Sequence, residues 1–159
     1  MKVSIIFGSK SDLEIMKGAA KCLEEFGIPY ELYVISAHRS SELLEKVIKD
    51  FENDGTEVII AGAGLAAHLP GVIASKTILP VIGVPIKANL EGLDSLLSIV
   101  QMPKQIPVAT VGINNSYNAG MLSVEILSLK YKDINKKLLD YRSKIKKQFE
   151  SEYKLGNKI

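Results

Sequence analysis

Short, nearly continuous apolar runs recur along the chain and alternate with segments of helical periodicity. Five runs are rich in Val and Ile and mostly lack alternating polar residues: 3–7, 30–35, 57–62, 80–85 and 107–112. Strands that are buried on both faces have this composition, which is typical of a parallel sheet covered by helices. We therefore expect the five runs to form the strands of one parallel sheet.

The segments between these runs place apolar residues at helical spacing. The predicted helices span 12–26, 41–53, 70–76, 93–100 and 117–129, and Gly27 is a stop signal for the first of them. Alternating strands and helices with right-handed crossovers give an open, doubly wound α/β sheet, for which the strand order 2-1-3-4-5 is the natural expectation. Since no internal repeat or linker is visible, residues 1–159 are expected to form a single domain.

The last thirty residues differ from the rest of the chain in charge. Residues 1–129 hold 10 Lys or Arg and 14 Asp or Glu, whereas residues 130–159 hold 10 and 4, which gives balances of −4 and +6. Apolar residues such as Ile134, Leu138, Tyr141 and Ile145 keep helical spacing in this segment. We expect an amphipathic helix over about 132–155 that packs on the body or on another subunit, in preference to a nucleic-acid-binding tail.

The composition limits the class of protein. Hydrophobic residues make up 47% and charged residues 24% of the chain, as in ordinary globular proteins. No apolar run reaches the roughly 18 residues that a membrane-spanning helix needs. Cys22 has no second cysteine with which to form an internal disulfide, and we expect it to be a small buried residue in a cytoplasmic protein.

Ligands of doubly wound sheets bind beyond the carboxyl ends of the strands, so the loops after the strands are the places to look for a site. The first loop, Gly8 to Asp12, offers the hydroxyls of Ser9 and Ser11 near the start of a helix, where anions bind favourably. Asp12 would repel a phosphate, so we expect it to cap the helix or to bind a sugar diol. A capped turn without a ligand is the alternative.

The second loop contains one of the two histidines and one of the two arginines of the chain. Arg39 can hold a phosphate through two parallel hydrogen bonds, and Ser36 can add a hydroxyl. His38 has the side chain whose ordinary pKa lies nearest neutrality, which suits proton transfer in either direction. These neighbours favour a functional His38 over a structural one.

The third loop, AGAGLAAH from Ala61 to His68, is built from small residues. It matches the dinucleotide fingerprint G-x-G-x-x-A only weakly, because Pro70 interrupts the long helix that the fingerprint requires. Its bare backbone instead suits close approach to a flat ligand or a small carboxylate. His68 either hydrogen-bonds in the site or caps the short helix that follows. The chain shows no zinc-ligand spacing and no phosphate-binding G-x-x-x-x-G-K-[ST] motif.

Taken together, the loop sequences resemble a known family. GSKSD, ISAHR, AGAGLAAHLPG, GVP, GLDSLLSIVQMP and PVATVGINN occur in this order between about Val3 and Tyr131 and closely resemble the 5-(carboxyamino)imidazole ribonucleotide mutases, the class I PurE enzymes of purine biosynthesis. The resemblance implies a three-layer, flavodoxin-like fold, a cytoplasmic homooctamer in which the C-terminal helix reaches a neighbouring subunit, and no metal, nucleotide cofactor or covalent adduct.

The resemblance also implies roles for individual residues. It assigns the 5′-phosphate to Ser9, Ser11, Ser36 and Arg39 and the ribose diol to Asp12. It assigns proton transfer to His38 and a second active-site place, of positioning character, to His68. The pocket for the carboxylate or free CO2 falls to the small residues Ala61, Gly62, Ala63, Gly64 and Ala66.

The implied reaction moves a carboxylate from the exocyclic nitrogen of the imidazole ribonucleotide to a ring carbon by way of CO2 held in the site. The chain departs from the usual family pattern in two places: Leu65 stands where many members carry glycine, and Lys104-Gln105 stands in a turn that often contains glycine. Two alternatives stay open: a class II relative that carboxylates aminoimidazole ribonucleotide directly, and a non-catalytic module that senses nucleotides.

Overall fold

Five parallel strands form the centre of the molecule. The computed structural model describes residues 1–153. The strands are β1 (Lys2–Phe7), β2 (Tyr30–Val34), β3 (Thr56–Gly64), β4 (Val81–Ile86) and β5 (Ala109–Thr110). They pair in the order β2-β1-β3-β4-β5, and every pairing is parallel. The expected strand order is thereby confirmed.

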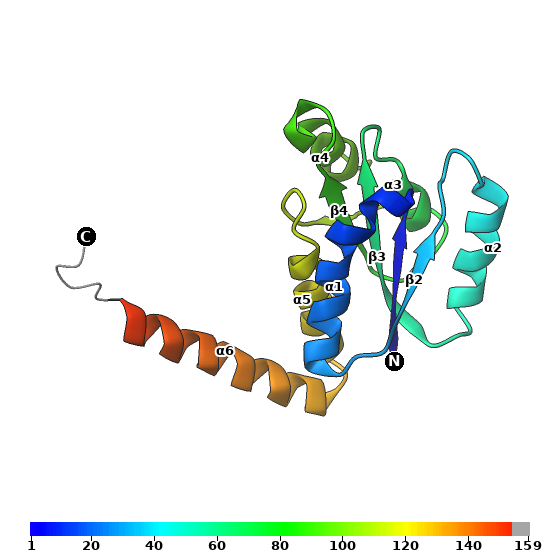
Figure 1. Ribbon diagram of the computed structural model, residues 1–159. Helices are drawn as coiled ribbons and strands as arrows, with labels where there is room; N and C mark the ends of the chain where they lie inside the picture. Colours follow the sequence, from blue (N-terminus) through cyan, green and yellow to red (C-terminus); the bar gives the residue numbers. More distant parts are fainter. Residues whose placement is uncertain (154–159) are drawn as a thin grey trace.

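Helices cover both faces of this sheet. They are α1 (Leu13–Phe26), α2 (Ser41–Phe51), α3 (Leu69–Ala74), α4 (Leu93–Val100), α5 (Ser116–Ser128) and α6 (Lys132–Glu152). Buried residues of α1 and α5 share one core with the sheet, and those of α2, α3 and α4 share the other. Figure 1 shows α1 and α5 on one side of the strands and α2 on the opposite side. The three-layer, flavodoxin-like α/β architecture is therefore confirmed.

Three strands differ in extent or burial from the prediction. β3 continues to Gly64, two residues past its expected end, because Ala63 and Gly64 stay paired with Pro85 and Ile86 of β4. β5 has two residues instead of six, and Pro107, which lacks an N–H to donate, lies just before it. β2 is an edge strand whose residues are mostly exposed, so its apolar run is not buried on both faces as expected.

The boundary of α1 follows the predicted stop signal. Gly27 adopts a left-handed conformation with φ of 68°, and its N–H donates to the carbonyl groups of Glu24 and Leu23. This geometry suits glycine because a side chain is strained there. Cys22, in the same helix, is fully buried, which agrees with the expected structural role.

Helix α6 leaves the body of the protein and extends away from it (Figure 1). Its first turns are attached: Ile134 is buried, the ring centroid of Tyr141 lies 5.2 Å from that of Phe26, and Lys137 Nζ donates to the Phe26 carbonyl at 2.7 Å. Farther along, Phe149 is 68% exposed. The helix begins at the expected residue, and positions 154 and 155 of the predicted range lie outside the described residues. Within residues 1–153, no helix is long and apolar enough to span a membrane.

Candidate active site

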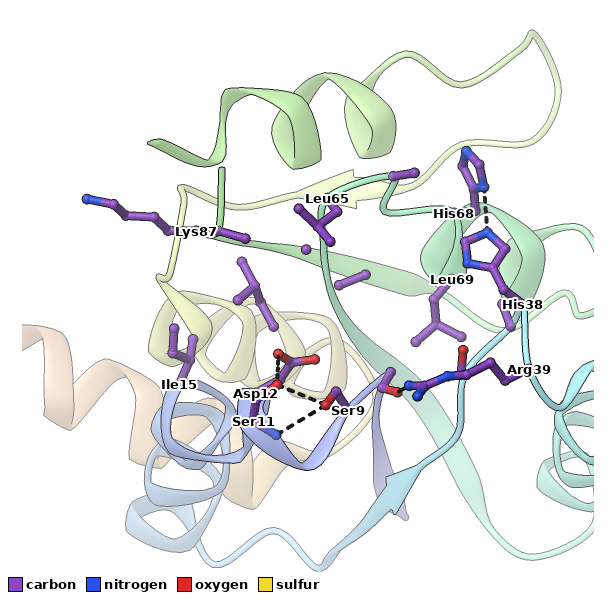
Figure 2. A pocket seen from close by; sticks show the side chains of 18 residues that line it. Ser9, Ser11, Asp12, Ile15, His38, Arg39, Leu65, His68, Leu69 and Lys87 are labelled. Carbon is purple, nitrogen blue, oxygen red and sulfur yellow. Dashed lines mark hydrogen bonds between the residues drawn. The ribbon is translucent and has the colours of Figure 1, made fainter. Parts of the chain in front are cut away.

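A cavity of about 660 Å³ lies at the carboxyl ends of β1, β2, β3 and β4. Figure 2 shows side chains from four separate loops converging on it. The lining residues are Gly8, Ser9, Ser11, Asp12, Ile15, Ser36, Ala37, His38, Arg39, Ala63, Gly64, Leu65, Ala66, His68, Leu69, Ile86, Lys87 and Ala88. Ten of the twelve residues that the sequence singled out are among them, so the fold brings the predicted set together at the expected edge of the sheet.

The first loop directs its hydroxyls and one carboxylate into the cavity. Ser9 caps a short 3₁₀ turn by accepting a hydrogen bond from the Ser11 N–H at 3.3 Å. The Ser11 hydroxyl lies 2.9 Å from Ser9 Oγ and 3.2 Å from Asp12 Oδ1. Asp12 precedes α1 but makes no side-chain cap hydrogen bond. Its carboxylate therefore retains the capacity to accept hydrogen bonds from a ligand.

The second loop contributes a guanidinium, that of Arg39, to the part of the cavity next to the first loop. Arg39 Nη2 donates to the Gly8 carbonyl at 3.0 Å, which ties the loop after β2 to the loop after β1. A guanidinium has five N–H groups in a fixed fork, so this bond leaves others for an anion. Ser36 lines the same region. The hydroxyls of the first loop and the guanidinium thus converge from neighbouring strands, β1 and β2.

The third loop forms a wall of small residues. Ala63, Gly64 and Ala66 line the cavity, whereas Ala61 and Gly62 lie deeper within β3 and do not. Ala61 is fully buried in the core, and a side chain on Gly62 would overlap Met16. Leu65 lines the cavity with φ of 56°, a left-handed conformation that a leucine rarely adopts. This backbone conformation explains why glycine suits the position.

The two histidines of the chain meet at one side of the cavity. His38 Nε2 lies 2.8 Å from His68 Nδ1, and the two rings stand nearly perpendicular at 80° with centroids 4.9 Å apart. His68 occupies the cap position of α3 but makes no side-chain cap hydrogen bond. Of the two alternatives for His68, the structure supports hydrogen bonding in the site. In Figure 2 the second ring nitrogen of His38, Nδ1, lies on the cavity side.

Several lining residues were not predicted. Lys87 follows β4 and forms an ion pair with Glu91, and its backbone N–H donates to Asn114 Oδ1 at 2.8 Å. Apolar side chains of Ile15, Leu69 and Ile86 complete the wall. Because Lys87 stands directly after a strand, the rule that identified the other loops applies to it as well.

This arrangement has two chemically distinct parts. Hydroxyls and a guanidinium suit a phosphate, and the nearby carboxylate of Asp12 suits a diol. The histidine pair, next to the wall of small residues, can give and take a proton. Residues 1–153 contain no group of three or more His, Cys, Asp or Glu side chains that could hold a metal ion.

Comparisons with known proteins identify the family of the chain. A family model described as AIR carboxylase matches residues 2–148. The N5-carboxyaminoimidazole ribonucleotide mutase of Pyrococcus horikoshii is 60% identical over 153 residues, which cover 96% of this chain and 86% of that protein. The mutase of the same name from Thermotoga maritima is 57% identical over 148 residues, with 92% and 86% covered.

A solved structure is also similar over nearly the full chain. The crystal structure of Treponema denticola PurE has a TM-score of 0.88 and 29% identity, and the match covers 98% of this chain and 99% of that one. Since the family model spans almost all of the residues and the relatives match at high identity, the chain belongs to the AIR carboxylase family.

Proposed function

We propose that this protein is an N5-carboxyaminoimidazole ribonucleotide mutase, an isomerase of de novo purine biosynthesis. The reaction moves the carboxylate from the exocyclic nitrogen to a ring carbon and yields 4-carboxy-5-aminoimidazole ribonucleotide. The observation that carries the proposal is the placement of His38 beside hydroxyls and a guanidinium in one cavity, in a chain that is 60% identical to a mutase of that name.

The phosphate end of the substrate binds between the first two loops. Arg39 keeps free N–H groups after its bond to Gly8, and Ser9, Ser11 and Ser36 offer hydroxyls close by. Charge-assisted hydrogen bonds of this kind are roughly twice as strong as neutral ones. The phosphate is therefore the main source of binding energy and fixes the orientation of the ribonucleotide.

Asp12 binds the ribose. Its carboxylate is half-buried, lines the cavity and makes no cap bond to α1. A carboxylate accepts two hydrogen bonds from a diol, whereas a phosphate at the same place would be repelled. Asp12 thus sets the distance between the phosphate and the imidazole ring.

The ring and the migrating carboxylate lie between the histidines and the third loop. Ala63, Gly64 and Ala66 leave room for a carboxylate or for free CO2, and Ala61 and Gly62 support that wall from behind in β3. Trapped CO2 has a high effective concentration next to the ring carbon, which favours recapture over escape.

His38 carries the proton. As an imidazolium it protonates the exocyclic nitrogen while the bond from that nitrogen to the carboxyl carbon breaks and CO2 forms. The electron-rich ring carbon then attacks CO2, and a carbon–carbon bond forms. Neutral His38 removes the proton from that ring carbon and returns to its first state, so the net proton change is zero.

The protein acts as an assembly of identical subunits. Residues 1–159 act as one catalytic domain in a cytoplasmic homooctamer, and α6 packs on a neighbouring subunit. The exposed apolar side chains of Leu139 and Phe149 on a helix that projects from the body support this placement, since water would otherwise cover them.

Two substrates distinguish the proposed reaction from its nearest rival. Purified protein is supplied with the carboxyamino ribonucleotide, or with aminoimidazole ribonucleotide plus bicarbonate, and formation of the carboxylated product is followed by its ultraviolet absorbance. We expect efficient turnover of the carboxyamino isomer without added bicarbonate. Efficient turnover of only the other mixture would identify a direct carboxylase, and no turnover of either with tight binding would identify a sensor.

A further inference from the structure

The bond between the two histidines joins loops that lie thirty residues apart in the chain. His38 Nε2 and His68 Nδ1 are 2.8 Å apart. Within residues 1–153, this is the only side-chain hydrogen bond that either ring makes. The contact therefore fixes how each ring is rotated, and it also decides where each ring can carry a proton.

We propose that His68 is a positioning residue that accepts a hydrogen bond from His38 Nε2–H and so confines proton transfer to His38 Nδ1. This inference rests on the proposed mutase function and deepens it. Both histidines lie on the cavity, and Nδ1 of His38 is the nitrogen on the cavity side (Figure 2).

The direction of the bond follows from what a proton carrier must do. An imidazole that gives and regains a proton at Nδ1 alternates between a cation with two N–H groups and a neutral ring with one. The N–H that persists in both states is at Nε2. Since Nε2–H needs an acceptor 2.8 Å away, His68 Nδ1 must be bare, and neutral His68 carries its proton at Nε2.

The opposite direction does not support the reaction. If His68 Nδ1–H donated to His38 Nε2, neutral His38 would hold its only proton at Nδ1. Giving up that proton would leave an imidazolate, which is far too basic to form at neutral pH. A His38 cation, which the reaction also needs, would place its Nε2–H against the Nδ1–H of His68. One bond geometry thus selects one tautomer for each ring.

The chain offers a direct spectroscopic test, because these are the only two histidines in it. Nitrogen-15 labelling of histidine gives four ring resonances, and a His68→Asn variant assigns them. We expect both neutral rings to carry the proton at Nε2. A neutral His38 or His68 with the proton at Nδ1 would overturn the inference.

A matched pair of variants provides the kinetic test. In His68→Asn the amide oxygen can occupy the place of Nδ1, whereas in His68→Gln the amide is one bond farther out, near the place of Nε2. We expect His68→Asn to keep most of kcat and His68→Gln to lower kcat by about 10- to 100-fold with little change in KM, because the His38 ring is no longer held.

The outcomes separate this inference from the proposed function. Binding of the product ribonucleotide and the melting temperature confirm that both variants are folded. Equal kcat values for the two variants would contradict a positioning role at Nδ1 while leaving the mutase function intact. Failure of the unmodified protein to isomerise the carboxyamino ribonucleotide would contradict the proposed function itself.

Discussion

Replacing Arg39 with lysine tests whether the guanidinium binds the phosphate of the ligand. The substitution keeps one positive charge but removes the planar fork that can form two parallel hydrogen bonds. It also removes the bond from Nη2 to the Gly8 carbonyl at 3.0 Å, which ties the second loop to the first. We therefore expect weaker binding of the ribonucleotide even though the charge is retained.

The size of the effect follows from the number of bonds lost. Lysine can replace one contact to the phosphate, so the net loss is about one charge-assisted hydrogen bond, worth about 1.5–3 kcal/mol. At 25 °C this corresponds to an increase in Kd of about 10- to 150-fold for the ribonucleotide. The same ligand without its phosphate should bind both proteins equally, because the guanidinium then has no charged partner.

Isothermal titration calorimetry with 4-carboxy-5-aminoimidazole ribonucleotide and with the corresponding riboside measures the four Kd values. Asp12→Asn is the matched control, since that carboxylate lines the same cavity but is assigned to the ribose. It should weaken both ligands to a similar extent. If Arg39→Lys weakened the riboside as strongly as the ribonucleotide, Arg39 would support the loops and would not bind the phosphate.

Three further predictions concern the body of the protein. Gln105 has φ of 79°, so Gln105→Gly should raise the free energy of unfolding by about 0.5–1 kcal/mol in a denaturant titration, whereas Lys104→Gly should lower it. Burial and, to a smaller extent, the nearby Glu25 carboxylate raise the pKa of the Cys22 thiol to about 12. Iodoacetamide at pH 8 should therefore label this thiol only after the protein unfolds, and rapid labelling of the folded protein would contradict the prediction. Burial raises the pKa of Asp54, but the hydrogen bonds that its carboxylate accepts, chiefly from Lys2, together outweigh burial and lower this pKa below 3.8. The ionised carboxylate of Asp54 therefore stabilises the fold at neutral pH, and this stabilisation is lost as the pH falls. Asp54→Asn should therefore be less stable at pH 7, and the difference should shrink below about pH 4 in thermal melts.

The sequence predicted the layers of the fold well because the pattern of buried strands depends on local composition. The runs 3–7 and 80–85, with Ser4 as their one polar residue, form strands inside the sheet. The run at 30–35 is apolar apart from Glu31, but β2 lies at the sheet edge, where Leu32 and Val34 are 42% and 47% exposed. Which strand lies at the edge of the sheet depends on pairing between distant segments, and the composition of one segment does not determine this pairing.

The site was predictable to the extent that each loop follows a strand. The sequence predicts the places of Arg39 and the serines because parallel strands bring their carboxyl ends to one edge. Ala61 and Gly62 were assigned to the wall of the site, yet β3 remains paired through Gly64 and keeps both of them beneath the surface. How far a strand continues beyond its apolar run depends on the strand with which it pairs, and the sequence of one segment does not determine this pairing.

The contact between His38 and His68 was the least predictable feature. The sequence indicates a candidate role for each histidine separately, and for His68 a simple helix cap is an alternative. The bond arises because the loops after β2 and β3 bend toward each other above β1, which lies between them in the sheet. Side-chain direction at a loop depends on a few backbone angles, and neither composition nor spacing determines them.

We propose that His38 moves the proton in a carboxylate transfer at this site. The most direct measurement compares turnover of the carboxyamino ribonucleotide, and binding of the product ribonucleotide, between the unmodified protein and His38→Asn. We predict that kcat falls by about 10²- to 10⁴-fold, the range expected for loss of a general acid–base group, while Kd for the product changes little. Turnover by His38→Asn at the rate of the unmodified protein would show that His38 does not transfer the proton.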